Sequence, residues 1–396
     1  METKTSPSPT RLGAKKKNRG QTMLISSAFD SGNIQVQNCD DVSNVRLRIK
    51  TDNKSDFFQW FHFRVSGVAD TGVRYIIENA GEAAYAEGWE NYKVCASYDR
   101  ETWFRIETSY DGAELKWEFE AEQDSLYFAY FAPYSMDRHA DLIAEVADSP
   151  LVKTSVLGHT LDGQDMDLVE VGYGPEGRKK IWLGARQHPG ETMAEWWMEG
   201  AFDFLLDEDN PVAAALLEKA HFYIVPNMNP DGSKRGHLRT NAVGANLNRE
   251  WIGATMARSP EVYLAREKMA ETGVDFHMDV HGDEDLPYNF IAGFEGIPSA
   301  TEKQLALLEK FQATLDSISP DFQRKHGYPL EEAGSSDLRK CTDYIAETHG
   351  CLAMTLEMPF KDNADRPDED FGWSPERCRH MAHACLHTLH QMVDKL

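Results

Sequence analysis

The first part of the chain alternates hydrophobic and polar residues in short runs that are rich in aromatic side chains. Examples are residues 45–49, 57–65 and 125–131, with clusters of Gly, Asp and Ser between the runs. A period of two residues is typical of strands with one buried face, and repeated strands of this spacing indicate an antiparallel β-sandwich. We therefore expect a β-sandwich domain over residues 22–145, which ends in a helical segment near 138–146.

After residue 150 the pattern changes to apolar strands that alternate with amphipathic helices. The expected strands are 180–185, 222–225, 274–280 and 352–356, and the expected helices are 191–206, 260–272, 301–316 and 377–395. Ser374 is a suitable N-cap for the last helix, because Pro375 follows it in the first turn. The alternation predicts an α/β domain over residues 146–396, with a mixed, mainly parallel central sheet flanked by helices. Such a domain binds ligands at the carboxyl ends of its strands.

The composition of the 396 residues agrees with two globular domains. Hydrophobic residues make up 41 % and charged residues 27 %, and the formal net charge is -24. A chain this acidic lacks the positive charge that displaces counterions from nucleic-acid phosphates, so a nucleic-acid partner is excluded. Binding of an acidic substrate would need a local basic pocket that works against the overall charge.

The sequence indicates a cytoplasmic protein with no membrane partner. No apolar run approaches the roughly 20 residues that a membrane span requires, and the apolar cluster at 23–25 is too short for a signal peptide. The six cysteines form no CxxC pair, which indicates reduced thiols. Residues 1–21 are rich in Ser, Pro, Thr and Lys and are predicted to form a disordered tail.

Candidate metal ligands follow the expected strand 180–185. His188 ends a strand–loop connection and Glu191 opens a helix, so both side chains can converge at the carboxyl edge of the sheet. Catalytic zinc is held by three imidazole or carboxylate ligands and keeps an open position for water. The HxxE motif alone is weak, and without other signals a surface histidine beside a helix N-terminal glutamate would be the better interpretation.

A third ligand is available on the expected strand 274–280. His277, Asp279 and His281 alternate with apolar residues and therefore share one face of this strand. His281 lies at the carboxyl end, where a site is expected, and we interpret it as the third ligand. We interpret His277 as a hydrogen-bonded histidine further down the sheet.

Other polar residues are suited to bind a carboxylate. The segment 235–251 contains three arginines and several asparagines, among them Arg239, Asn248 and Arg249. A guanidinium group offers a planar fork that fits a carboxylate, and an amide adds a neutral donor. Glu357 ends an apolar strand, and a desolvated carboxylate near a metal is suited to act as a general base.

In their order along the chain these motifs resemble those of the M14 family of zinc carboxypeptidases. The motifs that carry the resemblance are His188 with Glu191, Asn229-Pro230-Asp231-Gly232, Asn248-Arg249, His281 and Glu357. The β-rich first domain and the segment 130–134 resemble the cytosolic carboxypeptidase branch, of bacterial type. The resemblance covers nearly the whole chain after residue 22, and the combined motifs are specific although each alone is weak.

The resemblance implies a metallocarboxypeptidase, a zinc exopeptidase that hydrolyses the C-terminal peptide bond of peptides or proteins. His188, Glu191 and His281 would hold one Zn²⁺ per chain. Glu357 would take a proton from the attacking water and later deliver it to the leaving amine. The partners implied are peptide or protein C-termini, and a homo-oligomer is compatible with the sequence.

The resemblance also implies roles for the residues of the arginine-rich segment. Arg239 would stabilise the oxyanion of the tetrahedral intermediate, and Asn248 with Arg249 would bind the terminal carboxylate of the substrate. The family has an acidic residue that orients the first zinc histidine, and in this chain Asn246 stands in its place. An amide oxygen can still accept the imidazole N–H, but it raises ligand basicity less than a carboxylate does.

Two features of substrate binding stay open. Tyr328 and Tyr344 both lie in the region where secreted family members have a mobile tyrosine, and neither is in a matching motif. Arg339 and Lys340 lie in the region that lines the side-chain pocket of the family. They are as well explained by a solvated basic pair as by a preference for acidic C-terminal residues.

Two other functions were weighed. A zinc amidohydrolase that removes acyl groups from amino acids, similar to aspartoacylase, would share the metal ligands and the Asn-Arg pair, but it would not need the large β-domain. A protein-binding module without activity is disfavoured because ligands, base and carboxylate-binding pair are all present. The last helix also carries a histidine stripe, which we interpret as a helix flank because no carboxylate or Cys completes a metal site: His380, His383, His387 and His390.

Overall fold

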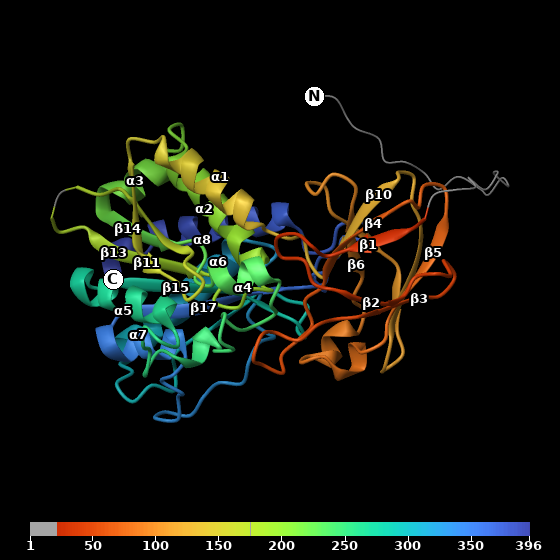
Figure 1. Cartoon of the computed structure of the whole chain (residues 1–396). Coiled ribbons are helices and arrows are strands. Elements are labelled where there is room, and N and C mark those ends of the chain that lie inside the picture. The colour runs from red at the N-terminus through yellow and green to blue at the C-terminus, as the bar shows by residue number, and fades with distance from the viewer. Residues whose placement is uncertain (1–21, 175) are drawn as a thin grey trace.

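A computed structural model describes residues 22–174 and 176–396. Two lobes lie side by side, a β-rich lobe built from the first part of the chain and an α/β lobe built from the rest (Figure 1). The tail predicted for residues 1–21 lies outside the described residues. No helix of the described residues is long and apolar enough to cross a membrane.

The β-rich lobe is a sandwich of two five-stranded sheets. One sheet has the order β1 (Leu24–Ser26), β4 (His62–Ser66), β10 (Ser125–Ala129), β6 (Val94–Ser97), β7 (Phe104–Ile106). The other has the order β2 (Gln35–Asn38), β3 (Val45–Arg48), β5 (Gly72–Ile77), β9 (Leu115–Glu120), β8 (Thr108–Tyr110). The predicted sandwich is therefore confirmed.

Aromatic side chains join the two sheets of the sandwich. The ring centroids of Tyr75 on β5 and Phe128 on β10 lie 4.9 Å apart, and those of Phe63 on β4 and Trp117 on β9 lie 6.4 Å apart. One pair, β3 with β5, is parallel, unlike the wholly antiparallel arrangement that we expected. The reason is that β4 lies between these two strands in sequence but belongs to the opposite sheet, so the chain returns to its first sheet in the original direction.

The α/β lobe is built on a seven-stranded mixed sheet. Its order is β11 (Val152–His159), β12 (Asp165–Val171), β14 (Ala220–Val225), β13 (Lys179–Ala185), β15 (Phe276–Asp283), β17 (Leu352–Pro359), β16 (Phe290–Ala292). The four central strands β14, β13, β15 and β17 are parallel, and the outer strands pair antiparallel. This agrees with the predicted sheet, and it brings the carboxyl ends of β13, β15 and β17 to one edge.

Helices cover both faces of this sheet (Figure 1). They are α1 (Met136–Ala147), α2 (Met193–Leu206), α3 (Pro211–Lys219), α4 (Pro230–Arg235), α5 (Pro260–Thr272), α6 (Glu302–Ile318), α7 (Cys341–His349) and α8 (Pro375–His390). Helix α1 contacts β11, α2 and α4 of the α/β lobe. The domain boundary predicted at 145/146 falls near the end of α1 and stays a prediction.

Two expectations about helix ends need correction. The segment Asn229-Pro230-Asp231-Gly232, expected as a turn, begins helix α4: the side-chain oxygen of Asn229 accepts a hydrogen bond from the Gly232 amide at 3.0 Å. An N-capping Asn followed by Pro starts a helix as readily as it makes a turn. Helix α8 begins at its predicted cap, Ser374, but it ends at His390, before a separate 3-10 turn at Val393–Lys395.

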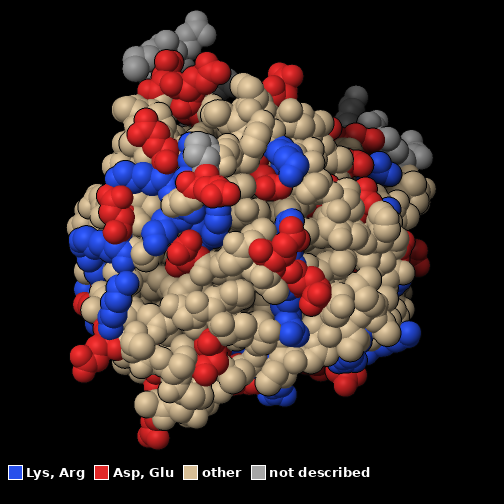
Figure 2. Space-filling view, turned by 90° about the vertical axis from the view of Figure 1, so that its left-hand side faces the viewer, with Lys and Arg blue, Asp and Glu red and all other residues tan. Residues whose placement is uncertain are grey.

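The surplus of acidic residues is not spread evenly over the molecule. On the face drawn in Figure 2, Lys and Arg side chains gather on one side, with Asp and Glu side chains between and above them. The net charge of -24 therefore does not describe each part of the surface. Local charge has to be considered around each cavity.

Candidate active site

Three predicted ligands converge at the carboxyl edge of the central sheet. His188 follows β13, Glu191 precedes α2, and His281 belongs to the neighbouring strand β15. Nδ1 of each histidine lies 2.7 Å from a different oxygen of Glu191, and the two Nδ1 atoms are 3.2 Å apart. Within the described residues this is the one group of His, Cys, Asp or Glu whose ligand atoms lie close enough together to hold a metal ion, and all three side chains are buried.

The Nε2 atoms of both histidines have hydrogen-bond partners that fix the orientation of the imidazole rings. Nε2 of His188 lies 3.1 Å from Oδ1 of Asn246, and Nε2 of His281 lies 2.9 Å from Oδ2 of Asp279. Asp279 also accepts a hydrogen bond from the Gln187 amide at 2.6 Å. Metal-binding histidines characteristically donate their second N–H to such an oxygen, which leaves Nδ1 as the metal-binding atom. The donor set therefore fits a zinc ion.

The electrostatics of the group also suit a cation. Burial opposes the charge on Glu191, but the two imidazoles hold the pKa of its carboxyl below the ordinary range. Burial and the nearby Arg239 lower the pKa of His188 to about 4, so its imidazole is neutral. Asp279 and Glu191 outweigh burial and raise the pKa of His281. Two carboxylates around two imidazoles thus favour positive charge at their centre, which a metal ion supplies.

A cavity of about 470 Å³ opens beside the group, and Glu357 is in its wall. Glu357 is paired in register with His281 on the adjacent strand β17. Its Oε1 lies 3.2 Å from the oxygen of the Tyr328 hydroxyl, and its Oε2 is buried and has no hydrogen-bond partner among the described residues. Burial raises the pKa of this carboxyl well above its ordinary value.

Two guanidinium groups line the same cavity. Arg239 has 14 % of its side chain exposed, and its Nη1 lies 3.9 Å from Oε1 of Glu191. Burial and the charge of Arg239 lower the pKa of Arg249. Asn248 also lines the cavity, and its Oδ1 accepts a hydrogen bond from the Cys341 amide at 2.8 Å. Because its oxygen is occupied, the side chain of Asn248 has its Nδ2 left to donate, so this part of the cavity wall offers hydrogen-bond donors that suit an anion.

Comparison with known proteins decides the family. The β-rich lobe matches the cytosolic carboxypeptidase N-terminal domain over residues 25–131, and the α/β lobe matches zinc carboxypeptidases over residues 140–273. The chain is 46 % identical to the metallo-carboxypeptidase from Burkholderia cenocepacia, with a TM-score of 0.91 over 94 % of this chain and 99 % of that one. The chain belongs to the M14 family of zinc carboxypeptidases.

Two further relatives set the limits of the likeness. The metallo-carboxypeptidase from Pseudomonas aeruginosa, solved in complex with (2-guanidinoethylmercapto)succinic acid, is 43 % identical, with a TM-score of 0.92 over 94 % of this chain and 99 % of that one. Mouse cytosolic carboxypeptidase 1 is 29 % identical over 295 residues, which are 62 % of this chain and 24 % of the mouse protein. As an M14 member, the protein is a metallocarboxypeptidase, a hydrolase.

The two basic residues expected near the side-chain pocket of this M14 enzyme are placed differently. Lys340 lines the cavity, and its ammonium lies 2.6 Å from Oε1 of Glu331 and 3.0 Å from Oδ2 of Asp343. Arg339 does not line the cavity: its side chain is 60 % exposed and forms a two-pronged ion pair with Asp337. The side chains of Arg339 and Lys340 point in different directions, so they cannot bind one substrate side chain together.

The two tyrosines that the sequence left open lie in different places. Tyr328 lines the cavity of the M14 site, and its hydroxyl donates to Oδ2 of Asp283 at 2.6 Å as well as contacting Glu357. Tyr344 does not line the cavity; its ring lies 6.0 Å from that of Trp251. A residue that the sequence did not point to, Tyr85 of the β-rich lobe, is also in the cavity wall. No motif marks Tyr85, because it approaches the site from another lobe.

The other histidines stay outside the metal group. His277 is buried, and its Nε2 lies 4.0 Å from the thiol of Cys341, while its Nδ1 has no partner among the described residues. On α8, the rings of His383 and His387 pack against Phe204, with centroids 5.6 and 4.9 Å away. These contacts agree with a helix flank and not with a second metal site.

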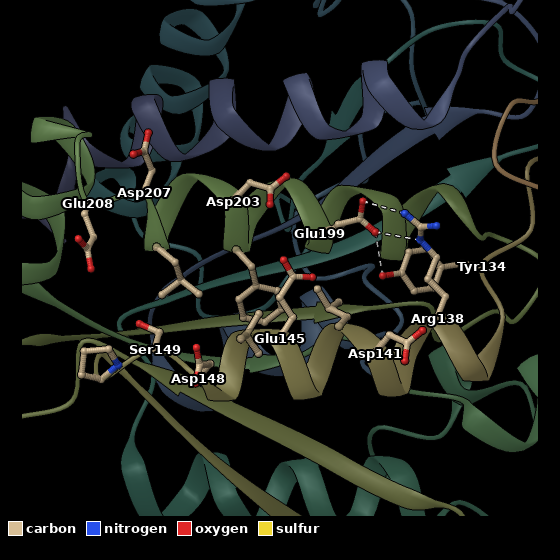
Figure 3. A pocket seen from close by; sticks show the side chains of 15 residues that line it. Tyr134, Arg138, Asp141, Glu145, Asp148, Ser149, Glu199, Asp203, Asp207 and Glu208 are labelled. Carbon is tan, nitrogen blue, oxygen red and sulfur yellow. Dashed lines mark hydrogen bonds and ion pairs between the residues drawn. The ribbon is translucent and has the colours of Figure 1, made fainter.

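A larger cavity of about 670 Å³ lies away from the metal group, between α1 and α2 (Figure 3). Its labelled side chains are mostly carboxylates, and Arg138 forms an ion pair with Glu199, which also accepts a hydrogen bond from the Tyr134 hydroxyl at 3.0 Å. None of these residues belongs to the metal group found in the described part of the chain. Size therefore does not identify the catalytic cavity of this M14 enzyme.

Proposed function

We propose that the protein is a zinc-dependent carboxypeptidase that removes the C-terminal residue of peptides or proteins by hydrolysis. The observation that carries the proposal is that a fitting metal group borders one cavity, which is also lined by a buried carboxylate and two guanidinium groups; one oxygen of that carboxylate has no hydrogen-bond partner among the described residues. These are the parts that hydrolysis of a peptide bond next to a free carboxylate requires.

His188, Glu191 and His281 are the proposed zinc ligands, with one Zn²⁺ per chain. Zinc bound there would polarise the scissile carbonyl and make a nearby water more acidic. Glu357 is the proposed general base, because it lines the same cavity as His188 and Glu191 and its Oε2 has no hydrogen-bond partner among the described residues. The proton that it accepts is then available for the leaving amine.

Asn248 and Arg249 are proposed to bind the terminal carboxylate of the substrate. Arg239 is proposed to stabilise charge on the scissile carbonyl oxygen, since its guanidinium is the one that lies near Glu191 of the metal group. The relative from Pseudomonas aeruginosa was solved with a succinate derivative that carries two carboxylates and a guanidino group, and its carboxylates support an anion site in the shared fold. The anchor gives the exopeptidase specificity, because an internal peptide bond offers no carboxylate to Arg249.

The test compares three substrates under identical conditions: a peptide with a free C-terminus, the same peptide with an amidated C-terminus, and an N-acyl amino acid. We expect release of single residues from the free acid, measured by mass spectrometry, and at least roughly a hundredfold slower cleavage of the amide, on the scale of a lost charged contact. Equal cleavage of the acid and the amide would contradict the exopeptidase. Preferred cleavage of the N-acyl amino acid would favour an aspartoacylase-like amidohydrolase.

A preference for acidic C-terminal residues is proposed to depend on Lys340, the basic residue of the pair that lines the cavity. A substrate carboxylate must replace Glu331 or Asp343 as a partner of its ammonium. The expected result is faster cleavage of C-terminal Glu than of Leu, and loss of that difference in Lys340→Met, while Arg339→Met retains it. Preferred removal of C-terminal Lys or Leu by the unmodified enzyme would reject the preference.

A further inference from the structure

The loop that carries Arg239 is held by a carboxylate of the other lobe. Asp52, in the β-rich lobe, has only 2 % of its surface exposed. Its oxygens accept hydrogen bonds from the backbone amides of Leu238 at 2.7 Å, Arg239 at 2.8 Å and Thr240 at 2.9 Å, and from the Thr240 hydroxyl at 3.0 Å. Four donors on one buried carboxylate fix the backbone on both sides of Arg239.

Further contacts tie this loop to the same lobe. The side chain of Asn33 donates to the Gly236 carbonyl at 2.9 Å, and the side chain of Asn53 donates to the Ala242 carbonyl at 2.6 Å. Gly244 has a φ of +80°, and a Cβ there would lie 2.3 Å from the Lys54 carbonyl oxygen. Contacts with the β-rich lobe therefore lie on both sides of Arg239, and at Gly244 the two backbones approach to a distance that only glycine permits.

The guanidinium of Arg239 also lies against aromatic rings of the β-rich lobe. Its central carbon lies 5.7 Å from the centre of the Phe57 ring and 5.3 Å from that of the Tyr85 ring. Tyr85 is itself held by Gln59, which donates to its carbonyl and accepts from its amide, both at 2.9 Å. These rings restrict the side chain of Arg239 as Asp52 restricts its backbone.

We propose that the β-rich lobe is part of the catalytic apparatus and that Asp52 is a positioning residue, which aims Arg239 at the scissile carbonyl. The inference rests on the proposed role of Arg239. Replacing either carboxylate oxygen with an amide NH2 group places a donor against a backbone N–H of the loop, so the loop has to move. A displacement of about 1 Å of a group that acts on the transition state can reduce turnover by about a hundredfold.

The first test uses the full-length zinc-loaded enzyme and the variant Asp52→Asn. We expect a fall in kcat by roughly ten- to a hundredfold, a KM that changes by less than about threefold, and unchanged zinc content. Thr240→Val removes one of the four donors with little change in shape, and we expect a smaller fall in kcat in the same direction. If Asp52→Asn does not fold, a normal kcat in Thr240→Val overturns the proposal.

The control is Glu101→Gln, a carboxylate-to-amide change at an exposed contact between the lobes. Glu101 pairs with Arg138 of α1 at 2.9 Å and does not touch the Arg239 loop. Its kcat and KM should equal those of the unmodified enzyme. An equal loss of kcat in Glu101→Gln and Asp52→Asn would show a general effect of the lobe contact and overturn the specific role of Asp52.

A double-mutant cycle with Arg239→Ala separates the inference from the proposed function. If Asp52 acts through Arg239, then Asp52→Asn lowers kcat by less than about threefold in the Arg239→Ala background, because the effects of coupled residues do not add. Additive losses overturn the positioning role. If Arg239→Ala has a reduced kcat and Asp52→Asn a normal kcat, only the positioning role of Asp52 is rejected. If Arg239→Ala has a normal kcat, the function proposed for Arg239 is rejected.

Discussion

Glu191 and Glu357 are two buried carboxylates of one cavity, and their surroundings give them opposite properties. The imidazoles of His188 and His281 lie against Glu191 and hold its pKa low, so it stays ionised as a metal ligand must. Glu357 has the Tyr328 hydroxyl as its partner, and burial raises its pKa. Because their pKa values are shifted in opposite directions, Glu191 is suited to bind a metal and Glu357 to transfer a proton.

This division predicts the behaviour of Glu357→Gln. The amide keeps the size of the side chain but cannot accept a proton, so kcat should fall by roughly two to four orders of magnitude while the zinc content stays the same. The control is Glu295→Gln, because burial also raises the pKa of Glu295 but its side chain does not line the cavity. Loss of zinc in Glu357→Gln, measured by metal analysis, would show that Glu357 is a metal ligand and not a general base.

Arg249→Ala tests the carboxylate anchor. Arg249 is expected to contact the substrate equally in the ground state and the transition state, so its loss should chiefly raise KM, by roughly tenfold or more, with a smaller change in kcat. Arg339→Ala is the matched control, because its guanidinium is exposed and paired with Asp337 outside the cavity. Both parameters are measured by steady-state kinetics with one peptide. An unchanged KM in Arg249→Ala would show that Arg249 does not bind the terminal carboxylate.

Residues of the site differ in how far the sequence could predict them. His188, Glu191 and His281 were predictable because strand ends and helix starts place them at one edge of a parallel sheet. Asp52 and Tyr85 were not, since both act from the β-rich lobe, Tyr85 in the cavity wall and Asp52 on the Arg239 loop, and no local periodicity encodes a contact between lobes. The sequence offered both Tyr328 and Tyr344, because it does not show that Tyr328 lies in the cavity wall while Tyr344, on α7, packs against Trp251.

At the scale of elements, a buried ionic network joins the helices to the strand that leads to the metal group. Nδ1 of His139 on α1 lies 2.6 Å from Oε1 of Glu195 on α2, and its Nε2 lies 3.1 Å from Oδ2 of Asp167 on β12. The other oxygen of Glu195 accepts from Arg186 at 2.6 Å. Arg186 has a φ of 59° and stands two residues before the first ligand, so the network fixes the start of the ligand loop.

The network predicts how stability depends on pH. Burial opposes the charge on His139, but Glu195 and Asp167 raise its pKa from 6.5 to about 9. A histidine with a raised folded-state pKa stabilises the fold fully below its unfolded pKa, near 6.5, and this contribution is lost as the pH rises through about 9. Urea unfolding should therefore give a free energy roughly 2–3 kcal/mol lower at pH 10 than at pH 6.5 from this group.

The control for this prediction is His139→Gln, which keeps hydrogen bonding but carries no titratable proton. Its free energy of unfolding should change less between pH 6.5 and pH 10 than that of the unmodified protein. An identical pH dependence in both proteins would show that His139 is not charged in the folded state at neutral pH.

Among the elements, the long periodic ones were predictable and the short ones were not. Helices α2, α5 and α6 carry enough turns for an apolar stripe, and their predicted bounds lie within two residues of the observed ones. Helices α3 and α4 are too short for a stripe and begin with Asn-Pro, a pair that also makes turns. Strands β11 and β12 pair antiparallel at the edge of the sheet. The alternation of strands and helices, from which the sheet was predicted, does not predict such strands.

At the scale of the whole molecule, the site depends on parts that are distant in sequence. The proposed ligands come from the loop after β13 and from β15, and the Arg239 loop is bonded to the β-rich lobe. Zinc binding should therefore stabilise the folded chain as a whole, because only the folded chain brings these groups together. The contacts between the lobes further predict that both unfold in one transition.

Metal removal tests this coupling. We expect about one zinc per chain by metal analysis, loss of activity on chelation, and a lower Tm in calorimetry, all restored by added zinc. At a free zinc concentration of about 100 times the Kd, the stabilisation is roughly 2.7 kcal/mol. His281→Ala should lack zinc and unfold at the temperature of the chelated enzyme, whereas His277→Gln, on the same strand but outside the metal group, should keep its zinc. Full zinc occupancy in His281→Ala would contradict the ligand assignment. A Tm that does not change on chelation would show that bound zinc does not stabilise the fold.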